Sequence, residues 1–328
     1  MTRHLAITCL AFAICCAGCS REPGETVDSS DEMRTRVVTT TGMIADLARA
    51  IGGDRVNVTN LIGEGVDPHL YKPTRDDVAA LLDADIIFYN GLHLEGRMGD
   101  VLARAGADRP TIAVTERLPE ERLIHPNDDQ DQDHADPHVW LAPELWALCG
   151  NTVCNALAEM RPQDRAEFQA NLETFQAGAA ELDALGTSAI GSIPRESRLL
   201  VTSHDAFNYF GRAFDIEVVG VQGISTDSEA GLADLEALVE LVVQRRVPAV
   251  FVESSVPRRS IEALVEGAAA RGHVVTIGGE LFSDSMGPAG TPEGTWKGMV
   301  HHDIQVVTES LGGTFPPSNG QAIPENLE

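Results

Sequence analysis

Short apolar runs alternate with helix-forming stretches on both sides of one long helical segment, and this order constrains the fold more than any other feature. The runs predict strands at 36–40, 56–62, 85–91, 111–116, 198–203, 217–222, 249–254 and 274–279. Apolar residues at helical spacing predict helices at 43–52, 74–84, 232–246 and 258–272. Strands that alternate with helices are typical of parallel sheets, so we expect an α/β fold.

The segment over 143–193 is almost entirely helix-forming. Proline disfavours helical backbone in the residue before it, so the Arg161-Pro162 pair is expected to end a first helix near Met160. A second helix then runs from about residue 163 to residue 190 and spans about 42 Å, at 1.5 Å per residue. A helix of this length outruns one small lobe. We expect it to join two α/β lobes as a rigid spine that permits only small rotation.

The N-terminus has the pattern of an export signal. A short charged start precedes an apolar stretch that is too short to span a bilayer. The sequence AGC ending at Cys19 resembles the end of a bacterial lipobox, although Cys16 stands where leucine is usual. We expect a signal peptide over 1–18 and a flexible tether over 19–35, anchored by a lipid on Cys19. The chain is therefore predicted to be exported to the periplasm or the cell surface.

The remaining residues divide around the long helix. We expect an N-terminal lobe over 36–160, a linker helix over 161–193 and a C-terminal lobe over 194–328. A chain of 328 residues is long enough to give each lobe its own core. The formal net charge of −26 disfavours nucleic acid and anionic lipid surfaces as partners.

Four of the six cysteines lie in the N-terminal leader, and the chain has no CxxC pair, which argues against a thiolate zinc site. Cys149 and Cys154 fall on one predicted helix, about 7.5 Å apart along its axis. A disulfide between them is therefore not expected, and we expect both to be buried as small apolar side chains.

Three histidines and one aspartate lie at the ends of predicted strands or in the loops that follow them. They are His69 in GVDPHLYKPTRDD, His138 in ADPHVWLAP, His204 in VTSHDAFNYFG and Asp284 in ELFSDSMG. In open α/β sheets, ligand sites form beyond the carboxyl ends of the strands. Each predicted lobe supplies two of the four residues, so they can converge in a cleft between the lobes.

The tripeptide Asp-Pro-His occurs twice, ending at His69 and at His138. Proline has a fixed φ and restricts the residue before it, so each loop is stiffened next to its histidine. Imidazole nitrogen suits Zn²⁺, and a carboxylate oxygen makes a site acceptable to Mn²⁺ as well. Three neutral histidines and one aspartate around a divalent ion would leave a net charge of about +1. The sequence therefore predicts a site for one Zn²⁺ or Mn²⁺ ion.

These motifs, together with GTWKGMVHHD, resemble the metal-binding subunits of bacterial zinc and manganese ABC transporters, the cluster A-I or TroA-like solute-binding proteins. The resemblance extends over roughly 36–313. It implies two α/β lobes joined by one long helix, and metal ligation by His69, His138, His204 and Asp284. It also implies a monomer without catalytic activity that is anchored in the membrane by its N-terminal lipid. Such a protein delivers its ion to a permease and its ATPase.

The third ligand bears on the choice of metal. Many manganese-type members of this family resemble the chain but carry glutamate at the position of His204. The histidine is more similar to TroA-type members, which are associated with both metals. Three nitrogen donors favour Zn²⁺ by affinity, without excluding Mn²⁺.

Other candidate residues have less support. Glu253 ends a predicted strand, and we expect it to hold a ligand histidine in its tautomer. The acidic run over 125–136 is predicted to be a surface loop that either collects metal weakly or is simply solvated. His93 and His273 lie in no sequence motif that supplies further ligands, and the pair His301-His302 is expected at the surface or an interface.

Two other functions remain open at this point. A zinc hydrolase could use the same ligands to activate water, but catalytic zinc usually keeps one position open and the chain has no HExxH motif. A surface adhesin is the second alternative, since lipoproteins of this family have been described as adhesins. The sequence contains no adhesive repeat.

Overall fold

A computed structural model describes residues 34–125 and 134–317 of the chain. In the N-terminal half, four parallel strands form one sheet in the order β2-β1-β3-β4. Their bounds are β1 Thr35–Thr39, β2 Val56–Asn60, β3 Ile86–Tyr89 and β4 Thr111–Ala113. Thr35, at the end of the predicted tether, is the first residue of β1.

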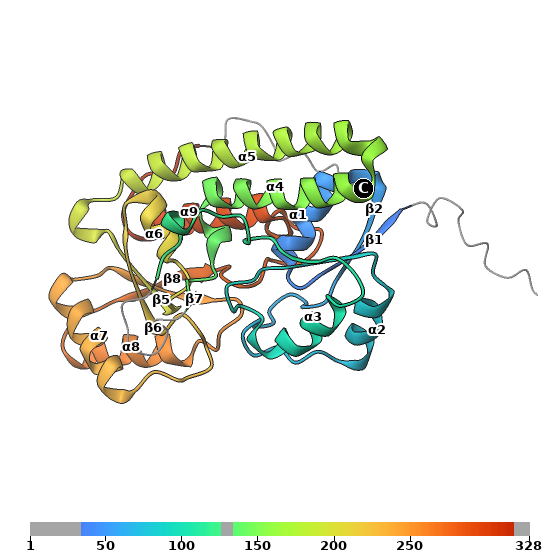
Figure 1. Ribbon diagram of the computed structural model, residues 1–328. Coiled ribbons are helices and arrows are strands. Elements are labelled where there is room, and N and C mark those ends of the chain that lie inside the picture. The colour runs from blue at the N-terminus through green and yellow to red at the C-terminus, as the bar shows by residue number, and fades with distance from the viewer. Residues whose placement is uncertain (1–33, 126–133, 318–328) are drawn as a thin grey trace, which may run out of the picture. The chain divides into compact units, whose positions relative to one another are not determined.

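The C-terminal half contains two parallel pairs of strands, β5-β6 and β7-β8. Their bounds are β5 Leu199–His204, β6 Glu217–Gln222, β7 Ala249–Glu253 and β8 Thr276–Leu281. Strands β5 and β7 lie next to each other, so the two pairs are side by side (Figure 1). The parallel α/β architecture expected from the sequence is therefore confirmed.

The described residues include nine α-helices (Figure 1). They are α1 Gly42–Gly52, α2 Arg75–Asp83, α3 Gly99–Ala105, α4 Pro143–Met160, α5 Arg165–Gly191, α6 Asn208–Phe214, α7 Leu232–Arg245, α8 Arg259–Ala270 and α9 Trp296–Ser310. The short helices α3 and α6 were not predicted from the sequence. Strand β8 begins two residues later than predicted, because Val274 is 83% exposed and lies outside the strand.

Neighbouring residues of the central strands contribute to two different cores. Val37 and Ile86 pack in a core with residues of α1 and α4, whereas Val38 and Ile87 pack in another with residues of α2 and α3. Successive side chains of a strand point to opposite faces, and a parallel sheet is covered by helices on both. The sheet is thus buried on both sides, which leaves its loops to carry the polar site.

Helix α5 has 27 residues and is about 40 Å long at 1.5 Å per residue. It packs against α1 and α4 in the N-terminal half and against α6 and α9 in the C-terminal half (Figure 1). One hydrophobic core includes residues from both sets of strands, such as Val37 and Phe251, together with Trp146 and Trp296. The long helix therefore lies along a core that the two halves share.

Among the described residues, no helix is both long and apolar enough to cross a lipid bilayer. The predicted signal peptide and the predicted lipidation site Cys19 lie outside the described residues. Residues 126–133 of the predicted acidic loop also lie outside them.

Candidate metal centre

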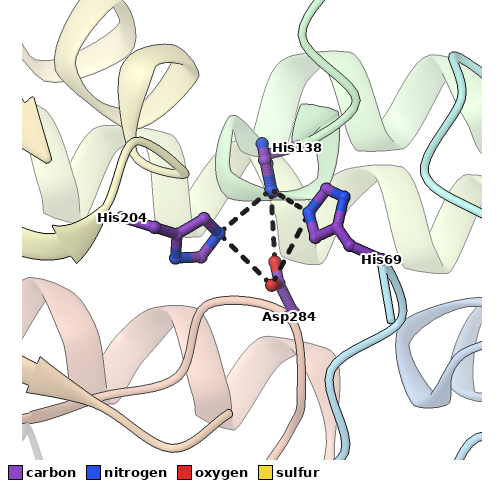
Figure 2. A group of neighbouring side chains, drawn as sticks. All are labelled: His69, His138, His204 and Asp284. Carbon is purple, nitrogen blue, oxygen red and sulfur yellow. Dashed lines mark hydrogen bonds and ion pairs between the residues drawn. The ribbon is translucent and has the colours of Figure 1, made fainter. Parts of the chain in front are cut away.

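The side chains of His69, His138, His204 and Asp284 converge in one buried cluster (Figure 2). One potential ligand atom from each residue lies within 4.8 Å of all the others. The two residues His138 and His204 have no exposed surface, while His69 is 5% exposed and Asp284 2%. The structure thus brings together all four residues that the sequence singled out.

Each of the four side chains extends from a loop or from the end of a strand. His69 lies in the loop between β2 and α2, and His138 directly precedes the short 3-10 helix Val139–Leu141. His204 is the last residue of β5, and Asp284 follows the end of β8. The carboxyl ends of parallel strands meet at one edge, which places these residues together although they are far apart in the chain.

The imidazole nitrogens of the cluster lie close to one another and to the Asp284 carboxylate, but they make no hydrogen bond to that carboxylate. The Nε2 atom of His138 lies 3.3 Å from that of His69 and 3.4 Å from that of His204. The oxygens of Asp284 lie 3.3 Å from Nε2 of His138 and 3.2 Å from Nε2 of His204, yet neither oxygen accepts a hydrogen bond from a described residue.

These spacings fit a bound metal ion. Zinc–nitrogen bonds of 2.0–2.1 Å at tetrahedral angles place two ligand nitrogens about 3.4 Å apart. The Nε2 atom of His138 lies at about this distance from those of His69 and His204, whereas Nε2 of His69 lies 3.9 Å from the carboxylate of Asp284. A buried carboxylate is costly unless positive charge lies beside it, and a bound cation would supply that charge. The cluster could therefore hold one ion.

Burial and the charges within the cluster shift the pKa values of its histidines. Burial lowers the pKa of His69 to about 3, so its ring is neutral near neutral pH. Burial opposes the charged form of His138, but the carboxylates of Asp136 and Asp284 outweigh it and raise its pKa to about 9. Burial is likewise outweighed at His204, where Glu253 and Asp284 raise the pKa well above its usual value.

The pKa of Asp284 is shifted downward, whereas the pKa values of His138 and His204 are shifted upward. Burial disfavours its charged form, but the rings of His204 and His138 hold its pKa well below the usual range. Without a metal ion, the centre is therefore an ionised carboxylate beside two protonated imidazoles. A divalent cation would take the place of those protons.

Glu253, the last residue of β7, holds His204 with both carboxylate oxygens. One oxygen accepts the backbone N–H of His204 at 2.9 Å, and the other lies 2.6 Å from its Nδ1. Glu253 is itself only 3% exposed. A proton on Nδ1 that faces a carboxylate leaves Nε2 free to face the centre of the cluster.

Asp136 makes the same two contacts with His138. Its Oδ1 accepts the backbone N–H of His138 at 2.9 Å and lies 2.8 Å from the ring Nδ1. The sequence predicted a surface loop that ends at Asp136. The prediction is wrong for Asp136 itself, which is completely buried. Asn208 and Tyr209 of the unpredicted helix α6 donate hydrogen bonds to its carboxylate and its carbonyl, at 3.1 and 2.9 Å.

The repeated Asp-Pro-His tripeptide is the signal that could have identified Asp136. Its two copies nevertheless differ in what the aspartate contacts. Asp67 accepts the backbone N–H of His69 at 2.8 Å, and its second oxygen accepts the Thr226 hydroxyl at 2.5 Å. The first copy thus ties the His69 loop to the C-terminal half of the chain.

Further hydrogen bonds join the ligand loops to one another. The indole N–H of Trp140, two residues after His138, donates to the carbonyl of Ser283 at 2.8 Å. The hydroxyl of Ser285 accepts the backbone N–H of Gly65 at 2.6 Å. The residues on either side of Asp284 are therefore bonded to the loops that carry His138 and His69.

The remaining predicted residues lie elsewhere. Cys149 and Cys154 are buried and unpaired on α4. His273 lies 2.8 Å from the carbonyl of Val247 through its Nε2 atom. His302 lies on α9, with its Nε2 atom 3.0 Å from the carbonyl of Glu280.

The chain is similar to proteins that are named for zinc uptake or for metal binding. A family model described as zinc-uptake complex component A, periplasmic, matches residues 37–310. The manganese-binding lipoprotein MntA of Bacillus subtilis is 43% identical over 306 residues, covering 93% of this chain and 97% of that protein. The zinc-binding protein TroA of Treponema pallidum is 44% identical over 284 residues, covering 87% and 91%.

The fold agrees with these sequence relationships. The solved structure of the periplasmic zinc-binding protein TroA from Treponema pallidum superposes with a TM-score of 0.82 at 45% identity, covering 85% of this chain and 99% of that one. Since both the family model and these relatives extend over most of its length, the chain belongs to the family of periplasmic zinc-uptake complex component A proteins.

Proposed function

We propose that the chain binds one divalent transition metal ion outside the cytoplasm and delivers it to an ABC importer. The proposed ligands are the Nε2 atoms of His69, His138 and His204 and the carboxylate of Asp284. One observation carries this proposal: three buried imidazoles converge on a buried carboxylate whose oxygens accept no hydrogen bond from a described residue. A cation bound among them would satisfy all four groups.

The donor set favours Zn²⁺ but also accepts Mn²⁺. Three imidazole nitrogens favour Zn²⁺ by affinity, and the carboxylate oxygen suits Mn²⁺. Similar proteins are named for both metals, since MntA is described as manganese-binding and TroA as zinc-binding. We therefore propose one Zn²⁺ or Mn²⁺ ion per chain, carried as cargo, with Zn²⁺ bound more tightly.

Burial of the site favours transport of a metal ion over catalysis by it. A catalytic zinc ion usually has three protein ligands and one position open to water. Here four protein donors surround one point, and none of the four residues is more than 5% exposed. A closed coordination shell suits capture and release, so we propose that the chain is not an enzyme.

The proposed partners are a membrane permease and its ATPase. MntA and the relatives from streptococci are named as lipoproteins, and the latter as substrate-binding lipoproteins of metal ABC transporters. By analogy, we propose that a lipid on Cys19 anchors the chain to the membrane and that it acts there as a monomer. The lobe boundaries at residues 160 and 194 belong to the same proposal.

Uptake of radioactive zinc and manganese by the host cell tests this function. Cells that lack the chain should lose uptake under metal limitation, and the wild-type gene should restore it. A variant with His204→Ala should not restore it although it is exported in equal amount. Uptake that does not depend on the chain, or that the variant restores fully, would overturn the proposal.

A further inference from the structure

One segment of the C-terminal half, residues 224–227, reaches the loop that carries His69. The segment lies between β6 and α7. Thr226 is only 8% exposed, and its hydroxyl donates to one carboxylate oxygen of Asp67 at 2.5 Å. The other oxygen of Asp67 accepts the backbone N–H of His69. A single side chain therefore connects Thr226 in one half to the backbone of a proposed ligand in the other.

The next residue of the segment makes a second contact with the N-terminal half. The carboxylate of Asp227 accepts a hydrogen bond from the guanidinium group of Arg97 at 2.5 Å. Arg97 lies in the short 3-10 helix Gly96–Met98, between β3 and α3. An exposed ion pair contributes little alone, but this one adjoins the buried hydrogen bond of Thr226. The segment is thus fixed to two separate loops of the N-terminal half.

The first two residues of the segment cover the side of the metal centre where His69 lies. Ile224 and Ser225 line a cavity of about 40 Å³, and His69 and Pro137 are also in its wall. A cavity of this size holds at most a few water molecules, which leaves little room for a hydrated ion. His69 is also the most exposed of the four proposed ligands. The segment therefore narrows a short path between the surface and the centre.

The start of the His69 loop is fixed independently of this segment. Gly65 donates its backbone N–H to the hydroxyl of Ser285, and the carboxylate of Glu64 accepts the backbone N–H of Ala289 at 3.3 Å. These contacts lie on the side of Asp284. Loss of the Thr226 contact would consequently free the loop near His69 while its start stays in place.

We propose that residues 224–227 form a latch between the two halves that limits how fast an ion enters and leaves the centre. While Thr226 holds Asp67 and Asp227 holds Arg97, the path to His69 is closed. Neither Asp67 nor Arg97 is a proposed ligand, so opening the latch should change the rates of exchange more than the affinity. The proposal rests on the proposed function, since exchange requires the centre to bind metal.

Substitution of Thr226 tests the buried contact. Thr226→Val keeps the shape of the side chain but removes the hydroxyl. Stopped-flow loading with Zn²⁺ alone and chelator-driven release should both become faster by roughly tenfold, the effect of losing one hydrogen bond to a carboxylate. The dissociation constant should stay unchanged. Thr226→Ser retains the hydroxyl and should restore rates close to those of the wild-type protein.

Reversal of charge tests the second contact without disturbing a buried residue. Asp227→Arg places two positive charges together and should also increase both rates. Adding Arg97→Asp restores a pair of opposite charges and should bring the rates back towards the wild-type values. Arg245→Gln is the matched control, because it removes an exposed ion pair with Glu217 that lies within the C-terminal half. Its rates should equal those of the wild-type protein.

Three results would overturn the latch. The first is unchanged rates in both Thr226→Val and Asp227→Arg. The second is an equal increase in Arg245→Gln. The third is faster release alone with a matching loss of affinity, which would show that the segment supports the bound ion and does not close a path.

Hydrogen exchange in the metal-free protein separates the latch from the proposed function. Backbone amides of residues 65–70 should exchange faster in Thr226→Val and at the wild-type rate in Thr226→Ser, because the latch holds this loop. Tight binding of Zn²⁺ with unchanged exchange in Thr226→Val would overturn the latch. Faster exchange in a protein whose wild-type form binds no Zn²⁺ would instead overturn the proposed function.

Discussion

At the scale of single residues, the centre contains two histidines that are held by carboxylates and one that is not. Glu253 contacts Nδ1 of His204, and Asp136 contacts Nδ1 of His138. Such partners orient a ligand ring and increase its basicity. His69 has its backbone fixed by Asp67 instead, and it is the ligand nearest to the surface. We therefore expect His69 to be the first ligand to bind and to release the ion.

Replacing the supporting carboxylates should weaken metal binding without removing a ligand. We expect Asp136→Asn and Glu253→Gln each to lower the affinity for Zn²⁺ by about 10–100-fold, because the histidine they hold loses its orientation and some basicity. Competition with a chelator of known affinity measures the change. Asp215→Asn, at an exposed carboxylate in an ion pair with Arg198, should leave the affinity unchanged. Equal affinities in all three variants would contradict the assigned roles.

Metal binding should release protons and depend on pH. The pKa of His138 is raised to about 9 and that of His204 is raised as well, so both rings are protonated near pH 7 in the metal-free protein. An ion binds only neutral imidazole and must displace these protons. Affinity should therefore rise with pH up to about 9 and fall as the pH is lowered. His69, with a pKa of about 3, should contribute no dependence near neutrality.

Calorimetry in two buffers that differ in ionisation enthalpy measures the protons released at pH 7. We expect the heat of binding to differ between the buffers. Identical heats, combined with an affinity that does not change as the pH is raised from about 6 to about 9, would show that the rings are neutral before the ion binds.

The four proposed ligands could be predicted from the sequence because each lies in a local motif, either at the end of a predicted strand or in a loop that follows one. Glu253 could be suggested for the same reason. The role of Asp136 was missed, since it ends an acidic run whose composition resembles a solvated loop. Its burial depends on Asn208 and Tyr209, which lie about seventy residues further along the chain. No local pattern contains that information.

At the scale of elements, the position of His204 depends on close contact between β5 and β6. Gly220 of β6 donates its backbone N–H to the carboxylate of Asp205 at 3.0 Å. A Cβ atom at Gly220 would lie 2.4 Å from the backbone nitrogen of Asp205 and 2.5 Å from the carbonyl carbon of His204. Only glycine allows the two backbones to approach this closely.

Gly220→Ala should therefore displace the end of β5. We expect it to lower the free energy of unfolding by about 1–3 kcal/mol, as overpacking does, and to weaken Zn²⁺ binding by moving His204. Gly223→Ala is the matched control, because a Cβ atom there would have no neighbour within 4 Å. Denaturant unfolding and chelator competition measure both effects. If the two variants behave alike, the contact does not position His204.

Strands that form a clear apolar run were easier to predict than the shortest helices. The second strand of the C-terminal half, at 217–222, was predicted with the bounds that β6 has. Helices α3 and α6 have seven residues each, too few for a pattern to be recognised. Val274 suggested an early start of β8, but the register is set by pairing of Thr276 with Ala249 in β7.

At the scale of the whole described molecule, the shared core argues against a large closing motion. Helix α5 packs against elements of both halves, and Trp296 donates a hydrogen bond to the carbonyl of Trp140 at 2.9 Å within the same core. Interiors packed in this way deform little. The rigid spine expected from the sequence therefore has a physical basis in shared packing.

Release of the ion should accordingly occur by movement of ligand loops, with little rotation of the halves. We expect small-angle X-ray scattering to give the same radius of gyration, within error, for metal-free and metal-loaded protein. Hydrogen exchange should instead slow on loading in the loops that carry His69 and Asp284. A clear decrease in the radius of gyration on loading would show that the halves close around the ion.

The central claim is that three imidazoles and one carboxylate bind one metal ion per chain. X-ray absorption spectroscopy at the zinc edge, on protein stripped of metal and reloaded with one equivalent of Zn²⁺, tests it most directly. The structure predicts multiple scattering from three imidazoles at about 2.0–2.1 Å, an additional oxygen ligand and no sulfur. In His204→Ala the imidazole count should fall to two. A spectrum with sulfur ligands, or one that His204→Ala leaves unchanged, would contradict the assignment.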